Sequence, residues 1–156
     1  MDQGVVVRQV TPDDLADLLP LMRAYCTFYE SDPADEDLHA MATAFLDADS
    51  GGTQLIARDT SGLALGHATV LWSWDTTLGQ RLAVMEDLFV TAEARGRGVG
   101  AALIEAARGL AADRGLRWLA WETAPDNHTA QRLYDGLGAH RETWYAYRLP
   151  TTDSAT

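Results

Sequence analysis

The chain has 156 residues, 47% of them hydrophobic and 22% charged, which is typical of one globular domain and excludes a disordered or fibrous protein. Its single cysteine, Cys26, excludes an internal disulfide and a multi-cysteine zinc site, and we expect a reducing cytoplasm as its location. The net charge of -11 disfavours nucleic acid and anionic membranes as partners, and no apolar run approaches the roughly 20 residues of a membrane-spanning helix.

The negative charge is concentrated in the N-terminal third of the chain. Residues 1–50 hold 11 acidic residues against two arginines, a net charge of -9, whereas residues 51–156 have a net charge of -2. An acidic surface of this kind attracts small cations, and it also keeps a protein soluble. Both interpretations are open at this point.

Hydrophobic spacing and turn residues predict a mixed α/β domain with the element order β-α-α-β-β-β-α-β-α-β. The predicted strands cover residues 4–10, 53–59, 63–74, 81–90, 116–122 and 142–149. The predicted helices cover residues 12–29, 33–50, 98–113 and 127–137. We expect a single domain over residues 1–150 and a polar tail over residues 151–156.

A glycine-rich loop between a predicted strand and a predicted helix is the most informative stretch, namely Arg95-Gly96-Arg97-Gly98-Val99-Gly100-Ala101. Glycine has no Cβ, so the backbone of such a loop approaches a ligand closely. The first N–H groups of the following helix and its dipole favour an anion at the same place. Because arginine side chains suit phosphate oxygens, the loop predicts a pyrophosphate site.

Other glycine-rich phosphate sites fit the loop less well. No Gly-Lys-Ser/Thr follows, which excludes a P-loop. Gly96-x-Gly98-x-x-Ala101 with Glu122 further along matches a relaxed dinucleotide fingerprint, but residues 91–95 separate the strand from the glycines. Too little chain follows Glu122 to complete a doubly wound sheet. A glycine-rich turn without a ligand remains an alternative.

These motifs resemble the GCN5-related N-acetyltransferases (GNAT). Arg95-x-x-Gly98-x-Gly100-Ala101 resembles the pyrophosphate loop of that family, and the strand of residues 86–90 resembles its central strand. A second family motif is similar to Asn127-x-x-Ala130-x-x-Leu133-Tyr134-x-x-Leu137-Gly138. The resemblance covers about residues 4–149, with Ala139 replacing a frequent aromatic residue. It implies the GNAT fold, a single mixed, largely antiparallel twisted sheet with helices on both faces and splayed central strands.

The resemblance also implies how acetyl-coenzyme A binds. The main chain of Leu88, Phe89 and Val90 would pair with the pantetheine arm, beside a gap between strands 84–90 and 116–122. Asn127 would bond the pantetheine or stabilise this splay. The pyrophosphate would be bound by Arg95, Gly96, Arg97, Gly98, Val99, Gly100 and Ala101.

Two further sets of residues follow from the resemblance and from the chemistry of amine acetylation. An ammonium group must lose a proton before it attacks, and the leaving thiolate gains one. We expect Glu86 as the base, with Asp87 as the alternative, and Tyr134 as the acid. The expected acceptor wall consists of Tyr25, Tyr29, Glu30 and Glu122. The two tyrosines also fit a packing role in the core.

The sequence therefore predicts an acetyl-CoA-dependent N-acetyltransferase that acts on a small cationic amine by direct attack in a ternary complex. The segment around Glu86, together with residues 28–30 and 121–123, is most similar to polyamine acetyltransferases and the yeast histone/polyamine type. The alternatives are a catalytically weak acyl-CoA-binding regulator, or an enzyme for amino acids or protein N-termini. No metal is expected, and the aromatic residues of strand 142–149 predict a homodimer surface.

Overall fold

In the computed structural model, which describes residues 4–153, a five-stranded sheet forms the centre of the unit Met1–Ala124. The strands lie in chain order, and every neighbouring pair is antiparallel except the last, which is parallel. They are β1 (Val6–Gln9), β2 (Gly52–Arg58), β3 (Ala64–Asp75), β4 (Gln80–Val90) and β5 (Leu119–Ala120). The predicted mixed, largely antiparallel sheet is confirmed.

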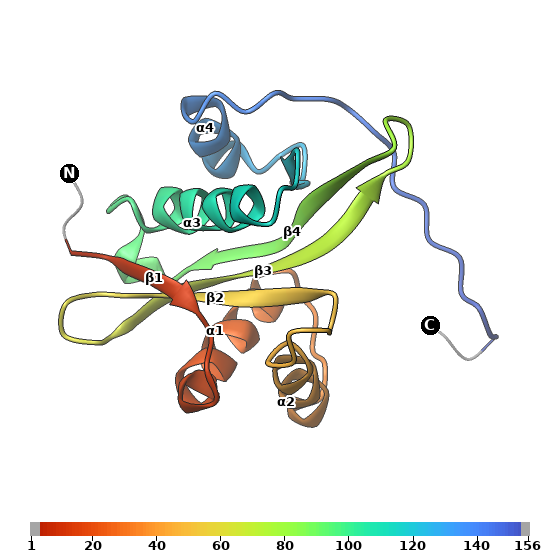
Figure 1. Cartoon of the computed structure of the whole chain (residues 1–156). Coiled ribbons are helices and arrows are strands. Elements are labelled where there is room, and N and C mark those ends of the chain that lie inside the picture. Colours follow the sequence, from red (N-terminus) through yellow and green to blue (C-terminus); the bar gives the residue numbers. More distant parts are fainter. Residues whose placement is uncertain (1–3, 154–156) are drawn as a thin grey trace. The chain divides into compact units, whose positions relative to one another are not determined.

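Helices cover both faces of this sheet (Figure 1). α1 (Leu15–Phe28) and α2 (Asp35–Ala44) pack on one face, and α3 (Val99–Asp113) packs on the other. Between α1 and α2 the apolar side chains at helical spacing form a buried cluster of Leu18, Met22, Leu38 and Ala42. The predicted second helix ends six residues early, because the chain turns at Phe45 after Ala44.

A close approach of backbone explains one glycine of β3. A Cβ on Gly66 would lie 2.4 Å from the Phe89 carbonyl oxygen and 3.3 Å from the Leu103 side chain. Only glycine therefore lets β3, β4 and α3 pack at their observed separation. This packing places the end of β4 beneath α3.

A buried carboxylate joins the start of α1 to the sheet. Asp14, in the short 3-10 helix Pro12–Asp14, accepts hydrogen bonds from Arg8 at 2.6 and 2.9 Å and from Arg58 at 2.7 Å. Burial opposes ionisation of this group, but the bonds from Arg8, the Thr11 N–H and Arg58 outweigh it and lower the pKa of Asp14. The Asp14 carboxylate thereby joins the short 3-10 helix before α1 to strands β1 and β2.

The second unit, Pro125–Thr156, contains one helix, α4 (His128–Gly136). The prediction of a strand over residues 142–149 is wrong, because residues 139–150 have neither helix nor strand. Alternating aromatic residues favour a strand only when a neighbouring strand supplies hydrogen bonds. The prediction of one domain over residues 1–150 stays a prediction.

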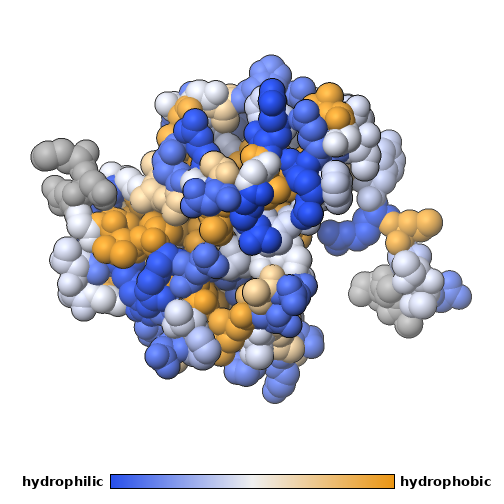
Figure 2. All heavy atoms as spheres, viewed as in Figure 1, coloured by the Kyte–Doolittle hydropathy of each residue, from blue (hydrophilic) through white to orange (hydrophobic). Residues whose placement is uncertain are grey.

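The surface in view is mostly polar, with hydrophobic side chains gathered beside β1 (Figure 2). Val6 on β1 is among the exposed large hydrophobic residues of the first unit, with 58% of its surface exposed. Within residues 4–153, every helix is too short or too polar to cross a membrane.

Candidate active site

The pairing between the central strands β4 and β5 covers only two residues of each strand. Ala83 pairs with Leu119 and Val84 with Ala120, and the Ala83 N–H donates to the Trp118 carbonyl at 2.8 Å. Beyond Val84 the described residues of β5 offer β4 no further pairing, so residues 85–90 have a strand neighbour, β3, on one edge only. The sheet is open beside residues 85–90, which agrees with the predicted gap, but β5 is much shorter than the predicted strand 116–122 and ends where its pairing ends.

A β-bulge lies at the point where the strands separate. Met85 faces Val70 and Asp87 faces Thr69, so Glu86 is the extra residue on β4. The Asp87 carboxylate accepts the Thr69 N–H at 2.7 Å and thereby replaces a partner that the bulge removes from the ladder. Glu86 is exposed, whereas the Asp87 side chain is only 13% exposed. One carboxylate therefore faces outward while its neighbour braces the strand.

The glycine-rich loop follows β4 after a short 3-10 helix, Ala92–Ala94. Gly98 is the N-cap of α3 with φ of 83°, a left-handed conformation that favours glycine, and Gly96 has φ of 74°. No side chain caps α3 among the described residues, and its first turn carries no acidic group. Its first N–H groups are therefore available to an anion. Arg95 lies beside this helix start, donating Nε–H to the Val90 carbonyl at 3.2 Å.

The C-terminal end of α1 supplies aromatic side chains on the opposite face of the sheet from α3. The rings of Tyr25 and Tyr29 lie 5.0 Å apart, and those of Phe28 and Tyr29 lie 5.1 Å apart. Burial raises the pKa of Tyr25, and the nearby charge of Asp87 raises it further. The structure thus brings Tyr25 close to the carboxylates of the bulge, while Tyr29 remains 49% exposed.

Glu30 ends this helix in an unusual conformation. Its φ of 55° makes it the one described non-glycine residue with a positive φ, and its side chain is exposed. The Ser31 N–H donates to the Cys26 carbonyl at 2.9 Å, as in a Schellman ending, where glycine is usual. A glutamate here therefore costs stability that glycine would not.

Three predicted site residues lie after β5. Glu122 is exposed and belongs to the first unit. In the second unit, Asn127 is the N-cap of α4, with its side-chain oxygen accepting the Ala130 N–H at 3.2 Å, and Tyr134 lies on α4, partly buried. The roles of these three residues stay predictions.

The sequence of this site matches a known family. The model of the acetyltransferase (GNAT) family matches residues 16–139. The chain belongs to the GNAT acetyltransferase family. An uncharacterized N-acetyltransferase, YhfO, of Bacillus subtilis is 28% identical over 143 residues, which cover 90% of this chain and 93% of that relative.

A second relative and a solved structure agree with this family. The D-amino-acid N-acetyltransferase HPA3 of Saccharomyces cerevisiae is 31% identical over 135 residues, covering 86% of this chain and 84% of that protein. The structure of AAC(6')-Iy with the bisubstrate analogue CoA-S-monomethyl-acetylneamine has a TM-score of 0.82 and 26% identity, covering 94% of this chain and 99% of that one. This GNAT chain is an N-acetyltransferase, a transferase with the GNAT α/β fold.

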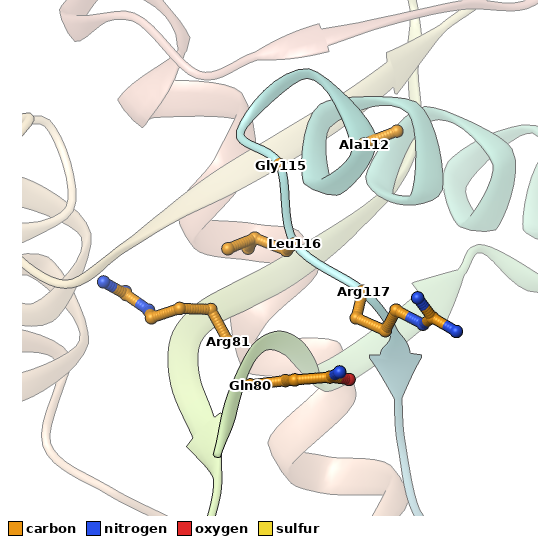
Figure 3. A pocket seen from close by; sticks show the side chains of 6 residues that line it. All are labelled: Gln80, Arg81, Ala112, Gly115, Leu116 and Arg117. Carbon is orange, nitrogen blue, oxygen red and sulfur yellow. The ribbon is translucent and has the colours of Figure 1, made fainter. Parts of the chain in front are cut away.

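A surface pocket of this GNAT chain lies at the other end of β4 from the bulge (Figure 3). It has a volume of about 520 Å³ and is lined by Gln80, Arg81, Ala112, Gly115, Leu116 and Arg117. The side chains of Arg81 and Arg117 point away from each other, so they do not converge on one ligand. The pocket adjoins the C-terminal end of α3, whereas the glycine-rich loop adjoins its N-terminal end.

Sequence reasoning missed a buried polar residue beside the bulge. His67 on β3 is fully buried, pairs with Phe89 in the sheet register, and places Nε2 3.5 Å from Asp87 Oδ1. Burial lowers the pKa of His67, opposed by the charge of Asp87. The sequence signal was a single titratable residue in the strand segment Gly66-His67-Ala68-Thr69-Val70.

Proposed function

We propose that this GNAT chain transfers the acetyl group of acetyl-CoA to the primary amine of a small cationic acceptor. The observation that carries the proposal is the continuity of the β4 edge at residues 85–90 with the uncapped start of α3. An edge with free N–H and C=O groups pairs with an amide-containing arm such as pantetheine. The helix start, flanked by Arg95 and Arg97, then receives the pyrophosphate.

In this proposal Leu88, Phe89 and Val90 hold the pantetheine through their main chain, and residues 95–101 bind the pyrophosphate. Asn127 binds the pantetheine or stabilises the segment after β5. The bisubstrate analogue in the AAC(6')-Iy structure joins coenzyme A to an acetylneamine group, which supports an acyl-CoA donor and an amine acceptor for a chain of this fold. The donor and acceptor meet in one ternary complex.

The chemistry assigns one proton to each of two side chains. Glu86 accepts a proton from the acceptor ammonium, which for an ordinary alkyl amine costs about 4–5 kcal/mol at pH 7. The amine nitrogen then forms a bond to the thioester carbonyl carbon, and the C–S bond breaks as the tetrahedral intermediate collapses. Tyr134 donates a proton to the leaving thiolate, for which a phenol has suitable acidity, and the second proton that the nitrogen loses as the amide forms returns to the Tyr134 phenolate.

A cationic acceptor is supported by the charges around α1 and α2. Arg23 pairs with Asp32 at 3.0 Å and with Asp35, so these two carboxylates are already engaged. Glu30, Glu36 and Asp37 have no salt bridge within residues 4–153. Together with the exposed ring of Tyr29 they suit the distal ammonium of a polyamine or diamino compound, and Glu122 completes this wall.

The decisive experiment measures coenzyme A release with a panel of amines at two salt concentrations. Spermidine, a neutral D-amino acid, an acidic amino acid and an aminoglycoside sample the acceptor classes. We expect the polyamine to have the highest kcat/KM, and its KM to rise with salt because the Debye length falls from about 10 Å at 0.1 M to 3 Å at 1 M. A preference for the acidic acceptor, or a polyamine preference that ignores salt, contradicts the cationic assignment.

A homodimer belongs to the same proposal. Trp144, Tyr145 and Tyr147 are 82%, 87% and 95% exposed, which is unusual for three aromatic side chains in one short segment. Burial of this segment against a second copy explains the alternating aromatic pattern of residues 142–149. Light scattering should give twice the chain mass of 17.0 kDa, and a monomer mass contradicts the dimer.

A further inference from the structure

We propose that His67 is a positioning residue for acetyl transfer, in which its Nε2–H holds the Asp87 carboxylate and, through it, the bulge that presents Glu86. This inference rests on the proposed function, because it takes Glu86 as the base. His67 itself does not touch the acceptor in this proposal.

The first support is the burial of His67 without hydrogen-bond partners. The residue is fully buried, and neither Nδ1 nor Nε2 has a hydrogen-bond partner among the described residues. Buried polar side chains are nearly always hydrogen-bonded, since an unpaired one is costly. A phenylalanine or leucine would fill the same place on β3 at lower cost. The imidazole therefore needs a reason beyond packing.

The surroundings of the ring supply that reason. Nε2 lies 3.5 Å from Asp87 Oδ1, slightly beyond an ordinary hydrogen bond, so a shift of a few tenths of an ångström brings the two atoms into bonding distance. The ring of Tyr25 lies edge-on at 6.2 Å and that of Phe89 at 6.1 Å. The Asp87 carboxylate is thus the group placed to accept a hydrogen bond from His67 Nε2–H.

The protonation state agrees with a donor role toward Asp87. Asp87 is the charged group that acts on His67, and Asp87, Tyr29, Glu86 and Cys26 act on the neighbouring Tyr25. Burial lowers the pKa of His67, so the ring is neutral at pH 7 and carries one N–H. With that proton on Nε2, the neutral ring donates a hydrogen bond to Asp87, and the Asp87 carboxylate stays ionised.

A second buried group shows that the bulge is held by side chains. Gln54 on β2 donates Nε2–H to the Thr69 hydroxyl at 3.0 Å, and the Thr69 N–H donates to Asp87 Oδ1 at 2.7 Å. Asp87 Oδ1 therefore accepts the hydrogen bond from the Thr69 N–H and also lies near His67 Nε2. Because Asp87 and Glu86 are adjacent in the bulge, a carboxylate that turns away from β3 displaces Glu86 as well.

The test is a double-mutant cycle between His67 and Asp87, measured with the best acceptor from the amine panel. We expect His67→Phe to lower kcat by about tenfold or more, the size of one lost hydrogen bond to a charged group. In the Asp87→Asn background the same change should cost less than about twofold. His67→Gln, which retains an N–H donor, should stay within about threefold of wild type. Acetyl-CoA affinity should be unchanged throughout.

Equal losses in both backgrounds, or a kcat of His67→Phe within twofold of wild type, overturn the inference. Ile56→Val is the packing control, because Ile56 is the buried cross-strand neighbour of His67 on β2 and should leave kcat unchanged.

A spectroscopic readout separates this inference from the proposed function. Proton–nitrogen spectra of the histidine ring should show the neutral Nε2–H tautomer of His67, with an Nε2 shift that changes in Asp87→Asn. An Nδ1–H tautomer overturns the inference whatever the enzyme acetylates. A wild-type protein that releases no coenzyme A with any amine contradicts the proposed function but leaves this spectroscopic test intact.

Discussion

The two ends of β4 differ in their strand pairing. At the first end, Ala83 is fully buried and β4 is held by β3 on one side and β5 on the other. At the second end, residues 85–90 have β3 alone, an added residue at Glu86, and the buried polar residues His67 and Thr69 on β3 beside them. Full pairing makes a strand rigid, whereas a half-paired end leaves backbone groups for a ligand.

The largest expected effect is on kcat and comes from Glu86, the proposed base at the second end of β4. Glu86→Gln removes the proton acceptor but keeps the shape of the bulge, so we expect kcat to fall by about 100- to 10,000-fold. Glu93→Gln, an exposed carboxylate in the short helix after β4, is the control and should have wild-type kcat. A kcat within about twofold of wild type for Glu86→Gln would remove Glu86 from the mechanism, leaving Asp87 as the candidate base.

The loop after the second end should control donor affinity. Gly100→Trp places a large side chain in the first turn of α3, where we expect the pyrophosphate, and should weaken acetyl-CoA binding by at least about tenfold. The same substitution at Gly109, an exposed site on α3 whose added Cβ would meet nothing within 4 Å, should leave affinity unchanged. Calorimetry would contradict the loop assignment if both variants bound equally well.

A substitution at the first end of β4 should lower the stability of the fold and leave acetyl-CoA affinity unchanged. Ala83→Leu adds three carbon atoms to a site with no free surface, and such overpacking typically costs about 1–3 kcal/mol of the free energy of unfolding. Acetyl-CoA affinity per folded molecule should stay at the wild-type value. Denaturant titration and calorimetry measure the two quantities, and an affinity loss without a stability loss would reverse the roles of the two ends.

The smallest expected effect is on the pH dependence of stability. The pKa of His67 is lower in the folded protein than in the unfolded chain, so its contribution to stability is complete above about pH 6.5 and is lost as the pH falls toward the folded value. Relative to His67→Phe, the wild-type protein should lose unfolding free energy between pH 7 and pH 5. Denaturant titrations at both pH values measure this difference, and parallel curves would contradict it.

Local sequence patterns determined most elements of the first unit. The apolar stripe of α1, the three strands β2, β3 and β4, and the glycine loop before α3 were all predictable, because each depends on residues near one another in the chain. The loop was also predictable as a phosphate site, since helix starts and glycine backbones bind anions in any fold. Glu86 and Asp87 were predictable as a pair of carboxylates on one strand.

Only the tertiary structure decided how those residues meet. The bulge at Glu86 depends on the register between β3 and β4, and the burial of His67 depends on the packing of α1 over β3. Neither feature can be predicted from a local sequence pattern. Residues 142–149 have the alternation of a strand and yet form none, because hydrogen bonds to a neighbouring strand, and not alternation itself, make a strand. Sequence determines which faces are apolar and which turns are tight, while pairing and burial belong to contacts between distant segments.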